Sequence, residues 1–264
     1  MLPPQYRSDV AAVSWRQPAA ETLTCHQAGS LVLVSSVTMP YWPTSEVKMG
    51  DLLSGLRQSD SRIETLAEGA TLLVGFATPD AANLMSALEQ ILVVAPFRHM
   101  TTPSGYRMSV AMTNCGRAGW VTDRTGYRYD PIDPMTGRAW PSMPDVFRSV
   151  AVRAAVAGGY PGFEPDACLI NRYEPGAKLS LHQDRNERDF AAPIISLSLG
   201  LPAVFLFGGL RRADRPRRVR LESGDVVVWG GPTRLAFHGI DRLADGDDPL
   251  TGRCRINLTL RKAL

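Results

Sequence analysis

The sequence predicts a β-rich α+β protein, in which a β-sandwich or jelly roll is preceded by two helices. Three observations predict this fold class. Short runs rich in Val, Ile and Leu recur after residue 165, and Gly or Pro separates most of them. Several of these runs alternate strictly between apolar and polar residues, as half-buried strands do. Before residue 160, apolar residues recur at helical spacing in two segments.

The composition is that of an ordinary globular protein. Among 264 residues, 44% are hydrophobic and 21% are charged, which excludes a disordered chain. The net charge of +3 is compatible with nucleic acid without requiring it. No apolar run reaches the roughly 18 residues of a membrane helix, and no signal peptide is recognisable. The four cysteines form no C-x-x-C pair, which argues against a disulfide scaffold or a zinc ribbon and favours the cytoplasm.

Residues 1–48 differ from the rest of the chain. They carry three basic and three acidic residues, and their one apolar run, Leu31 to Val34, is isolated among Pro and Ser. We expect a poorly ordered extension. Met49 opens a more globular segment, so the alternative is that translation starts there and residues 1–48 are an artefact of the assigned start. The predicted folded domain is 49–264.

The two predicted helices lie in the first half of this domain. A strand at 72–74 precedes a helix with Thr78 as its N-cap and Pro79 as its first residue, and Pro96 ends this helix. The second helix runs from about Pro144 to Ala157.

Between the helices, residues 97–141 are rich in Gly, Pro, Tyr and Trp, which is typical of a binding surface. Strands then dominate. They are predicted at 167–173, 195–201, 204–207, 226–229 and 253–261. The third and fourth are continuous apolar runs, which predict burial on both faces.

His182-Gln183-Asp184 is the first signal of chemistry. In an extended segment, residues two apart point to the same side, so an imidazole and a carboxylate can converge on one ion. His238 follows the strand at 226–229 and is the best third ligand. Two histidines and one carboxylate suit non-haem Fe(II), because open positions remain for a co-substrate and oxygen. An H-x-D alone is common by chance, so the assignment depends on a feature that explains the open positions.

The strand at 253–261 supplies that feature. Arg255, Asn257, Thr259 and Arg261 line one face of it. Buried guanidinium groups need anionic partners, and they fit carboxylates two bonds at a time. The two arginines lie about 20 Å apart along a strand, so one can hold the distal end of a dicarboxylate and the other can lie near the metal. Asn171 and Tyr173 could add hydrogen bonds. An exposed edge strand with a solvated polar face is the alternative.

Six arginines form a positive stripe within ten residues. They are Arg211, Arg212, Arg215, Arg217, Arg218 and Arg220, and Asp214 alone opposes them. We expect an exposed hairpin, part of which contacts phosphate or a base edge. The alternative is a merely solvated face.

Four stretches resemble bacterial AlkB, a family of Fe(II)/2-oxoglutarate-dependent dioxygenases that repair alkylated nucleic acid. They are N-R-Y-x-P-G-A-K-L-S-L-H-Q-D at Asn171–Asp184, G-D-V-V-V-W-G-G at Gly224–Gly231 with His238, R-x-N-L-T-x-R at Arg255–Arg261 and S-V-A-M-T-N-C-G-x-x-G-W at Ser109–Trp120. The similarity covers about Ala67 to Arg261. It implies a double-stranded β-helix (jelly-roll) catalytic core at about 164–264, flanking N-terminal helices and a nucleotide-recognition lid at about 97–141.

The resemblance also implies the site residues. His182, Asp184 and His238 would bind the iron and form the catalytic centre. The 2-oxoglutarate would be held by Asn171, Tyr173, Arg255, Asn257 and Arg261. The base would be placed by Trp120, Tyr127, Tyr129, Lys178, Asn186 and Arg212. Asn186 stands where the family usually has Asp. The Asn side chain keeps a hydrogen-bond acceptor but loses the negative charge, so the preference among bases stays open.

The implied function is Fe(II)- and 2-oxoglutarate-dependent oxidative demethylation of bases such as 1-methyladenine and 3-methylcytosine in DNA, with RNA left open. This direct-reversal DNA repair consumes O2 and releases formaldehyde, succinate and CO2. The expected partner is alkylated single- or double-stranded DNA, and a monomer outside the membrane is expected. The alternatives are a 2-oxoglutarate dioxygenase that acts on a protein or a small molecule, and a non-catalytic nucleic-acid-binding module.

Overall fold

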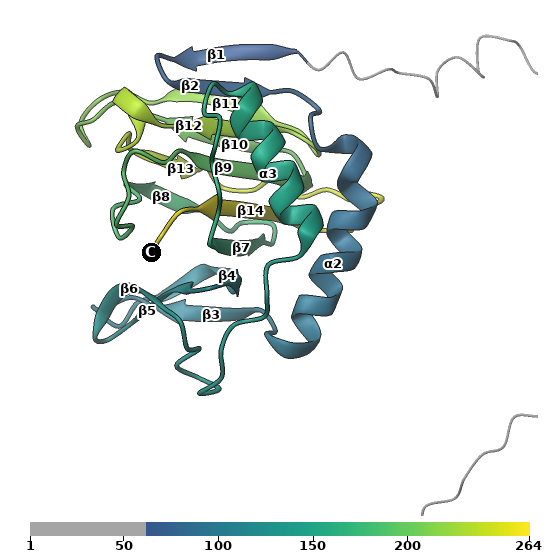
Figure 1. Cartoon of the computed structure of the whole chain (residues 1–264), viewed down its shortest axis with the longest axis vertical. Coiled ribbons are helices and arrows are strands. Elements are labelled where there is room, and N and C mark those ends of the chain that lie inside the picture. Colours follow the sequence, from purple (N-terminus) through teal and green to yellow (C-terminus); the bar gives the residue numbers. More distant parts are fainter. Residues whose placement is uncertain (1–61) are drawn as a thin grey trace, which may run out of the picture. The chain divides into compact units, whose positions relative to one another are not determined.

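Fourteen strands and two long helices make up residues 62–264, the part of the chain that the computed structural model describes (Figure 1). The predicted extension at 1–48 and the boundary at Met49 lie outside these residues. The strands are β1 (Ile63–Ala67), β2 (Ala70–Leu73), β3 (Arg98–Thr101), β4 (Arg107–Gly116), β5 (Gly119–Asp123), β6 (Gly126–Asp130), β7 (Ala167–Tyr173), β8 (Leu179–His182), β9 (Ile194–Gly200), β10 (Ala203–Phe207), β11 (Arg217–Leu221), β12 (Val226–Trp229), β13 (His238–Ile240) and β14 (Arg255–Arg261). The helices are α2 (Ala81–Val94) and α3 (Asp145–Ala157).

The strands form two antiparallel sheets and a separate ribbon. The larger sheet has eight strands in the order β1-β2-β12-β9-β14-β7-β4-β3, and the smaller has four in the order β11-β10-β13-β8. β5 and β6 form the two-stranded ribbon. Side chains from both sheets line one shared cavity. This arrangement confirms the predicted β-rich α+β fold with a jelly-roll core.

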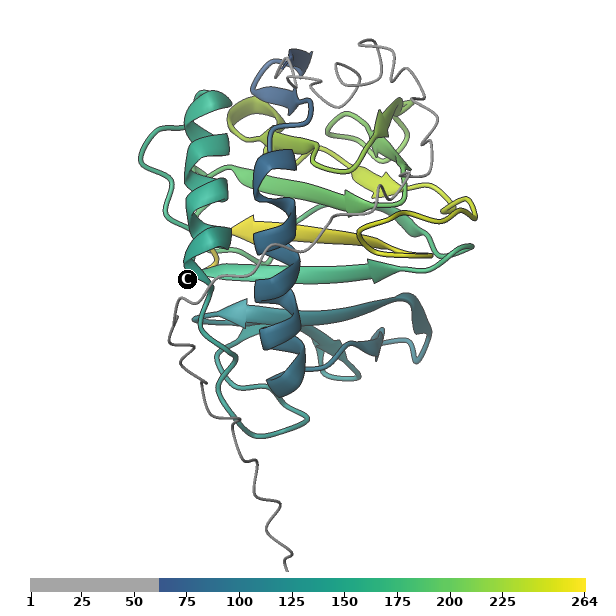
Figure 2. The same ribbon diagram turned by 90° about the vertical axis from the view of Figure 1, so that its right-hand side faces the viewer.

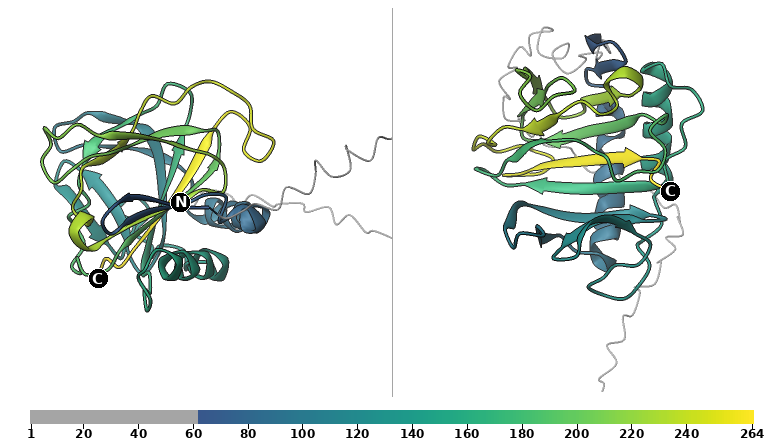
Figure 3. Two further views of the ribbon diagram at one scale, coloured as in Figure 1. Left: turned by 90° about the horizontal axis from the view of Figure 1, so that it is seen from above. Right: turned by 90° about the vertical axis from the view of Figure 1, so that its left-hand side faces the viewer.

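Both helices lie side by side against the outer face of the larger sheet (Figures 2 and 3). α2 buries Leu84, Leu88 and Ile91 on one face, which is the helical spacing that the sequence predicts. Gly158 is the C-cap that follows α3, and a Cβ atom on it would lie 2.6 Å from Cγ1 of Val228. A glycine at this position therefore lets the end of the helix rest directly on β12.

The predicted N-cap at Thr78 is wrong. Thr78–Asp80 forms a 3-10 turn, and α2 begins only at Ala81, without a side-chain cap. The backbone N–H of Thr78 donates to the carbonyl of Gly75, and Gly224 packs closely against Thr78, so the turn is closed by neighbouring backbone rather than by a cap.

All five strands predicted after residue 165 are present, with ends shifted by at most two residues. The alternative of an exposed edge strand at the C-terminus is wrong, because β14 lies between β7 and β9 and is buried along its whole length. The predicted burial of Val204–Phe207 on both faces is also wrong. Val204 and Leu206 are half-buried, since β10 belongs to the smaller sheet, whose outer face is covered by neither of the two long helices of residues 62–264.

β10 and β11 form the predicted hairpin in the arginine-rich segment, and β11 is the edge strand of its sheet. Within the predicted lid at 97–141, β3 and β4 extend the larger sheet, and the β5–β6 ribbon packs against it as a separate two-stranded sheet. No helix within residues 62–264 is long and apolar enough to span a membrane.

Candidate active site

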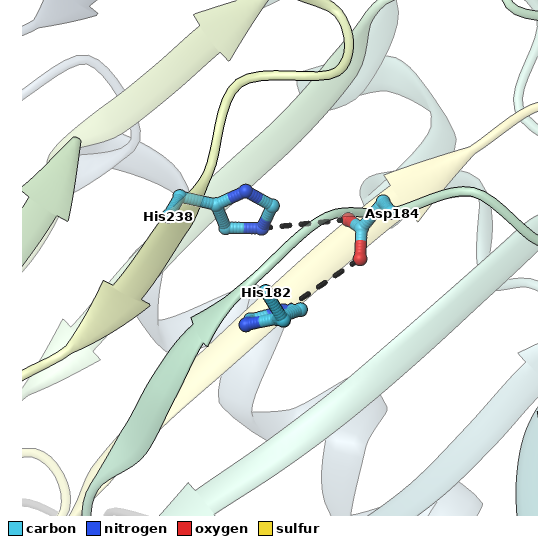
Figure 4. A group of neighbouring side chains, drawn as sticks. All are labelled: His182, Asp184 and His238. Carbon is cyan, nitrogen blue, oxygen red and sulfur yellow. Dashed lines mark ion pairs between the residues drawn. The ribbon is translucent and has the colours of Figure 1, made fainter. Parts of the chain in front are cut away.

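Three side chains converge where the smaller sheet meets the cavity. His182 ends β8, Asp184 follows two residues later, and His238 begins β13 (Figure 4). β8 and β13 are paired so that the two histidines lie directly opposite each other. Nε2 of His182 lies 3.7 Å from Oδ1 of Asp184, and Nε2 of His238 lies 3.7 Å from Oδ2. One atom from each residue could therefore bind the same ion, since these atoms all lie within 4.8 Å of one another.

The backbone prepares both imidazoles for metal binding. Nδ1 of His182 lies 2.9 Å from the carbonyl oxygen of Ser180, and Nδ1 of His238 lies 3.0 Å from that of Ala236. A carbonyl only accepts, so each Nδ1 carries a proton and each Nε2 is the ring nitrogen left to face a metal. Burial, reinforced by His182, lowers the pKa of His238 to about 4, so this imidazole is neutral at physiological pH.

Arg261 holds Asp184 from the opposite side. Its Nη2 and Nε donate to Oδ2 at 2.5 and 3.0 Å. Burial favours a neutral carboxyl, but Arg261 and the two histidines outweigh it and hold the pKa of Asp184 well below its usual range. The residue is therefore a carboxylate, and two imidazoles with one carboxylate are a donor set that suits non-haem Fe(II).

Arg255 has an unsatisfied buried charge. It is 1% exposed, its Nη2 donates to Oγ of Ser198 at 2.8 Å, and its Nε and Nη1 have no partner within the described part of the chain. Its guanidinium lies 5.1 Å from the ring centre of Tyr173. Among residues 62–264, Oδ1 of Asn171 also has no hydrogen-bond partner. A buried guanidinium with two free donors needs an anion, so the site fits a ligand that carries a carboxylate.

The cavity in front of these groups has a volume of about 740 Å³. Of the residues predicted to hold 2-oxoglutarate, Asn171, Tyr173, Asn257 and Arg261 line it, and Arg255 lies against the Tyr173 ring. Of the residues predicted to place the base, Trp120, Tyr127, Lys178, Asn186 and Arg212 line it. The rings of Trp120 and Tyr127 are stacked, with centres 5.8 Å apart and planes 25° apart.

Tyr129 is not among the lining residues. Its hydroxyl donates to Oε1 of Glu187 at 2.7 Å and accepts from Nη1 of Arg261 at 3.2 Å. The structure thus places Tyr129 beneath the cavity, where it links the β5–β6 ribbon to the residues around Asp184.

Sequence reasoning missed two residues of this supporting network. Arg234 is 3% exposed and donates to the backbone carbonyls of Asp184 and Ala192. It also forms an ion pair with the buried Glu187 at 3.3 Å. No local pattern marks either residue, because about fifty positions separate them and only the fold brings them together.

Comparison with known proteins decides the family. Residues 69–261 match the family model of the 2OG-Fe(II) oxygenase superfamily. The chain belongs to this superfamily. Within the superfamily it belongs to the AlkB family, as the sequence motifs predicted, since it is 59% identical over 200 residues to the alpha-ketoglutarate-dependent dioxygenase AlkB of Escherichia coli (strain K12). That match covers 76% of this chain and 93% of its relative.

Two further members of the family are similar to the chain. The tRNA demethylase abh1 of Schizosaccharomyces pombe is 33% identical over 160 residues, which cover 54% of this chain and 52% of that protein. The solved structure of OsALKBH1 is 30% identical with a TM-score of 0.69, and the match covers 76% of this chain and all of that one. The protein is therefore an Fe(II)/2-oxoglutarate-dependent dioxygenase, and O2 is its further co-substrate.

Arg234 gives a first prediction for this AlkB-family enzyme. Replacing it with Lys is expected to weaken Fe(II) binding about 10–100-fold, because a single ammonium cannot hold the Asp184 and Ala192 carbonyls and Glu187 together. The measurement is a titration of the purified apoprotein with Fe(II) under anaerobic conditions. The exposed Arg188 provides the matched control, Arg188→Lys, which should bind iron normally. Equal Fe(II) affinity in both variants would contradict the proposal that Arg234 supports the loop that carries Asp184.

Proposed function

We propose that the protein removes N-linked methyl groups from bases of the 1-methyladenine and 3-methylcytosine type in single- or double-stranded DNA, with RNA as a further substrate. The observation that carries this proposal is the stacked pair of Trp120 and Tyr127 in the same cavity as His182, Asp184 and His238. A base must leave its stack before its edge can be oxidised, and an aromatic face receives such a base. Relatives in the family include an enzyme named for tRNA demethylation.

The site residues have distinct proposed roles. His182, Asp184 and His238 bind iron on one side and leave its other positions free. Arg255, Asn171 and Tyr173 bind the distal carboxylate of 2-oxoglutarate, for which the two free donors of Arg255 are suited. Asn257 donates to Oγ of Ser196 and lines the cavity between the iron ligands and the residues that hold the distal carboxylate. Arg261 keeps Asp184 ionised and correctly oriented.

In the proposed demethylation, the protein mainly positions the iron, the 2-oxoglutarate and the base relative to one another. When bound, Fe(II) and 2-oxoglutarate activate O2, and the 2-oxoglutarate leaves as succinate and CO2. The methyl group on the base nitrogen gains a hydroxyl. Its N–C bond then breaks as the new hydroxyl gives up its proton, so that the carbon leaves as formaldehyde and the nitrogen recovers the electron pair of the bond. Trp120 and Tyr127 hold the base so that its methyl group faces the metal side of the cavity.

The arginine-rich segment contributes less to nucleic-acid binding than its charge indicates. Arg211, Arg218 and Arg220 are paired with Asp214, Asp241 and Glu222, and Arg217 donates to backbone carbonyls of β1. Arg212 is different, because it lies over the ring of Phe237 and lines the cavity. We therefore assign the phosphate-binding role to Arg212, together with Lys178 and Arg185 at the same cavity.

We also propose that the protein acts as a monomer in the cytoplasm. The proposed ligands of the iron, the 2-oxoglutarate and the base all lie on this one polypeptide, which is compatible with a monomer. Cys115, Cys168 and Cys254 are free thiols, which fits a reducing compartment.

Replacing Trp120 with Ala is expected to lower kcat/KM for a methylated strand about 10–100-fold, because a stacked base is worth roughly 1–3 kcal/mol. The slow consumption of 2-oxoglutarate without a strand should persist, since the metal site is untouched. Trp120→Phe keeps an aromatic face and should recover most of the activity. An equal loss in both variants would contradict stacking and indicate a structural role.

The proposed function is tested by the intact mass of a short single strand that carries 1-methyladenine, after incubation with enzyme, Fe(II), ascorbate and 2-oxoglutarate. We expect the strand to lose its methyl group. An unchanged strand with steady succinate release would indicate a protein or small-molecule substrate. An unchanged strand that binds without succinate release would indicate a non-catalytic binding module.

A further inference from the structure

Tyr129 lies on the same face of the β5–β6 ribbon as the aromatic side chains proposed to receive the base. It is directly opposite Trp120 across the ribbon, and it follows Tyr127 by two positions on β6. Side chains that face each other across paired strands, or lie two apart on one strand, point to the same side. The ring of Tyr129 therefore leaves the ribbon on the side of the stacked pair of Trp120 and Tyr127.

The hydroxyl of Tyr129 bonds to two residues that hold Asp184 in place. An arginine only donates and a carboxylate only accepts, so the hydroxyl accepts from Nη1 of Arg261 at 3.2 Å and donates to Oε1 of Glu187 at 2.7 Å. Arg261 in turn donates to the carboxylate of Asp184. Glu187 pairs with Arg234, which donates to the backbone carbonyl of Asp184. One hydroxyl is thus connected to Asp184 by two routes, through its side chain and through its backbone.

The two strands of the ribbon are fixed in different ways. The side-chain amide of Asn114 bonds to both the backbone N–H and the carbonyl of Trp120, each at 3.0 Å, and so anchors β5 to β4. Within the described part of the chain, β6 pairs with β5 and with no other strand. A contact from Nδ2 of Asn186 to the carbonyl of Tyr127 is long at 3.5 Å. Without the hydroxyl of Tyr129, β6 is therefore free to shift relative to the loop after β8.

We infer that the hydroxyl of Tyr129 holds Trp120 and Tyr127 in register with the proposed iron ligand Asp184, so that a base stacked on these rings presents its methyl group to the metal. Tyr129 is then a positioning residue, because it acts through Arg261 and Glu187 and does not line the cavity. The inference rests on the proposed function.

Register matters because a reacting group that is displaced by about 1 Å can lose about 100-fold in rate. Removal of the Tyr129 hydroxyl leaves the bonds from Arg261 to Asp184 in place, and Arg255 lies away from the change. Iron and 2-oxoglutarate should therefore still bind, and 2-oxoglutarate should still be consumed. The misplaced methyl group should be oxidised less often for each 2-oxoglutarate consumed.

Tyr129→Phe tests the inference, because it removes the hydroxyl and keeps the ring. The measurement is the amount of formaldehyde released per succinate, with Fe(II), ascorbate, 2-oxoglutarate and a saturating single strand that carries 1-methyladenine. The intact enzyme should release equal amounts of the two products. In Tyr129→Phe we expect formaldehyde per succinate to fall about tenfold, because the methyl group is out of position. Both products come from one sample, so partial loss of folded enzyme cancels in the ratio.

Two binding measurements on the apoprotein distinguish lost register from a lost binding site. One is a titration with Fe(II) under anaerobic conditions, and the other is the Kd for the methylated strand by fluorescence anisotropy. Both values for Tyr129→Phe should stay close to those of the intact protein, since Asp184 keeps its bonds to Arg261 and Trp120 keeps its anchor on β4.

Tyr160→Phe is the matched control. Its hydroxyl also bonds within the protein, to the carbonyl of Gly69 at 2.8 Å, but Tyr160 does not line the cavity, so this variant should keep the ratio of the intact enzyme. An unchanged ratio in Tyr129→Phe, or a fall that accompanies weaker binding of Fe(II) or of the strand, would overturn the inference. In either case, methyl-dependent formaldehyde from the intact enzyme would still support the proposed function. No methyl-dependent formaldehyde from the intact enzyme would overturn both.

Discussion

Replacing His182 with Ala is expected to reduce methyl-dependent turnover to the background rate. The candidate iron site has three protein ligands, and two would hold the metal too weakly for catalysis. His182 is the most informative of the three to remove. Its side chain is 35% exposed and its Nδ1 bonds only to the carbonyl of Ser180 on the same strand, so the loss of stability should be about 1 kcal/mol or less.

Asp184→Ala is a poorer test, because it also removes the nearer of the two carboxylates that pair with the buried Arg261 and leaves Glu187 as the remaining one, so the fold loses stability along with the metal ligand. His99→Ala is a suitable control for His182→Ala. Its imidazole also bonds to a backbone carbonyl, that of Met108, but it does not line the cavity. The measurements are succinate release and Fe(II) binding by the purified variants. Full turnover by His182→Ala would contradict the proposed ligand set.

Replacing Arg255 with Met is expected to raise the KM for 2-oxoglutarate about a hundredfold or more. The substitution removes the buried cation proposed to hold the distal carboxylate, and loss of a buried charge partner costs about 2–5 kcal/mol. Burial lowers the pKa of Arg255, which shows that the charge is unfavourable where it lies without an anion. The Tm of the free protein should therefore stay the same or rise in Arg255→Met.

Arg261→Met provides the contrast on the same strand. It leaves Asp184 and Glu187 without their shared cation, so it should lower the Tm of the free protein. The measurements are the KM for 2-oxoglutarate and thermal unfolding with and without 2-oxoglutarate. An Arg255→Met variant with an unchanged KM would show that the distal carboxylate binds elsewhere.

The sequence predicted the central parts of the site because they follow short-range rules. Alternation places Arg255, Asn257 and Arg261 on one face of β14, and the structure has them there, opposite Tyr173 and Asn171 of β7 and Ser198 of β9. The H-x-D spacing brings His182 and Asp184 together in the same way. His238 joins this pair because β8 pairs with β13, which is a contact between distant parts of the chain. In the sequence, only the order of the motifs along the chain indicated it.

The parts that the sequence did not predict depend on contacts between distant residues. β1, β8 and β13 are three to five residues long, and their pairing with neighbouring strands fixes them more than their own pattern does. Glu187 and Arg234 carry no motif, yet together they support the loop that holds Asp184. The pairing of the arginines on β11 with nearby carboxylates likewise depends on where Asp241 and Glu222 fold.

The most direct measurement is the stoichiometry of formaldehyde and succinate in a reaction that contains 2-oxoglutarate, Fe(II), ascorbate and a short strand with one 1-methyladenine. An unmethylated strand of the same sequence is the control. We predict equal amounts of the two products, release that depends on the methyl group, and loss of both products in His182→Ala. Succinate that forms at the same rate with either strand, without formaldehyde, would contradict the proposed demethylation of nucleic acid.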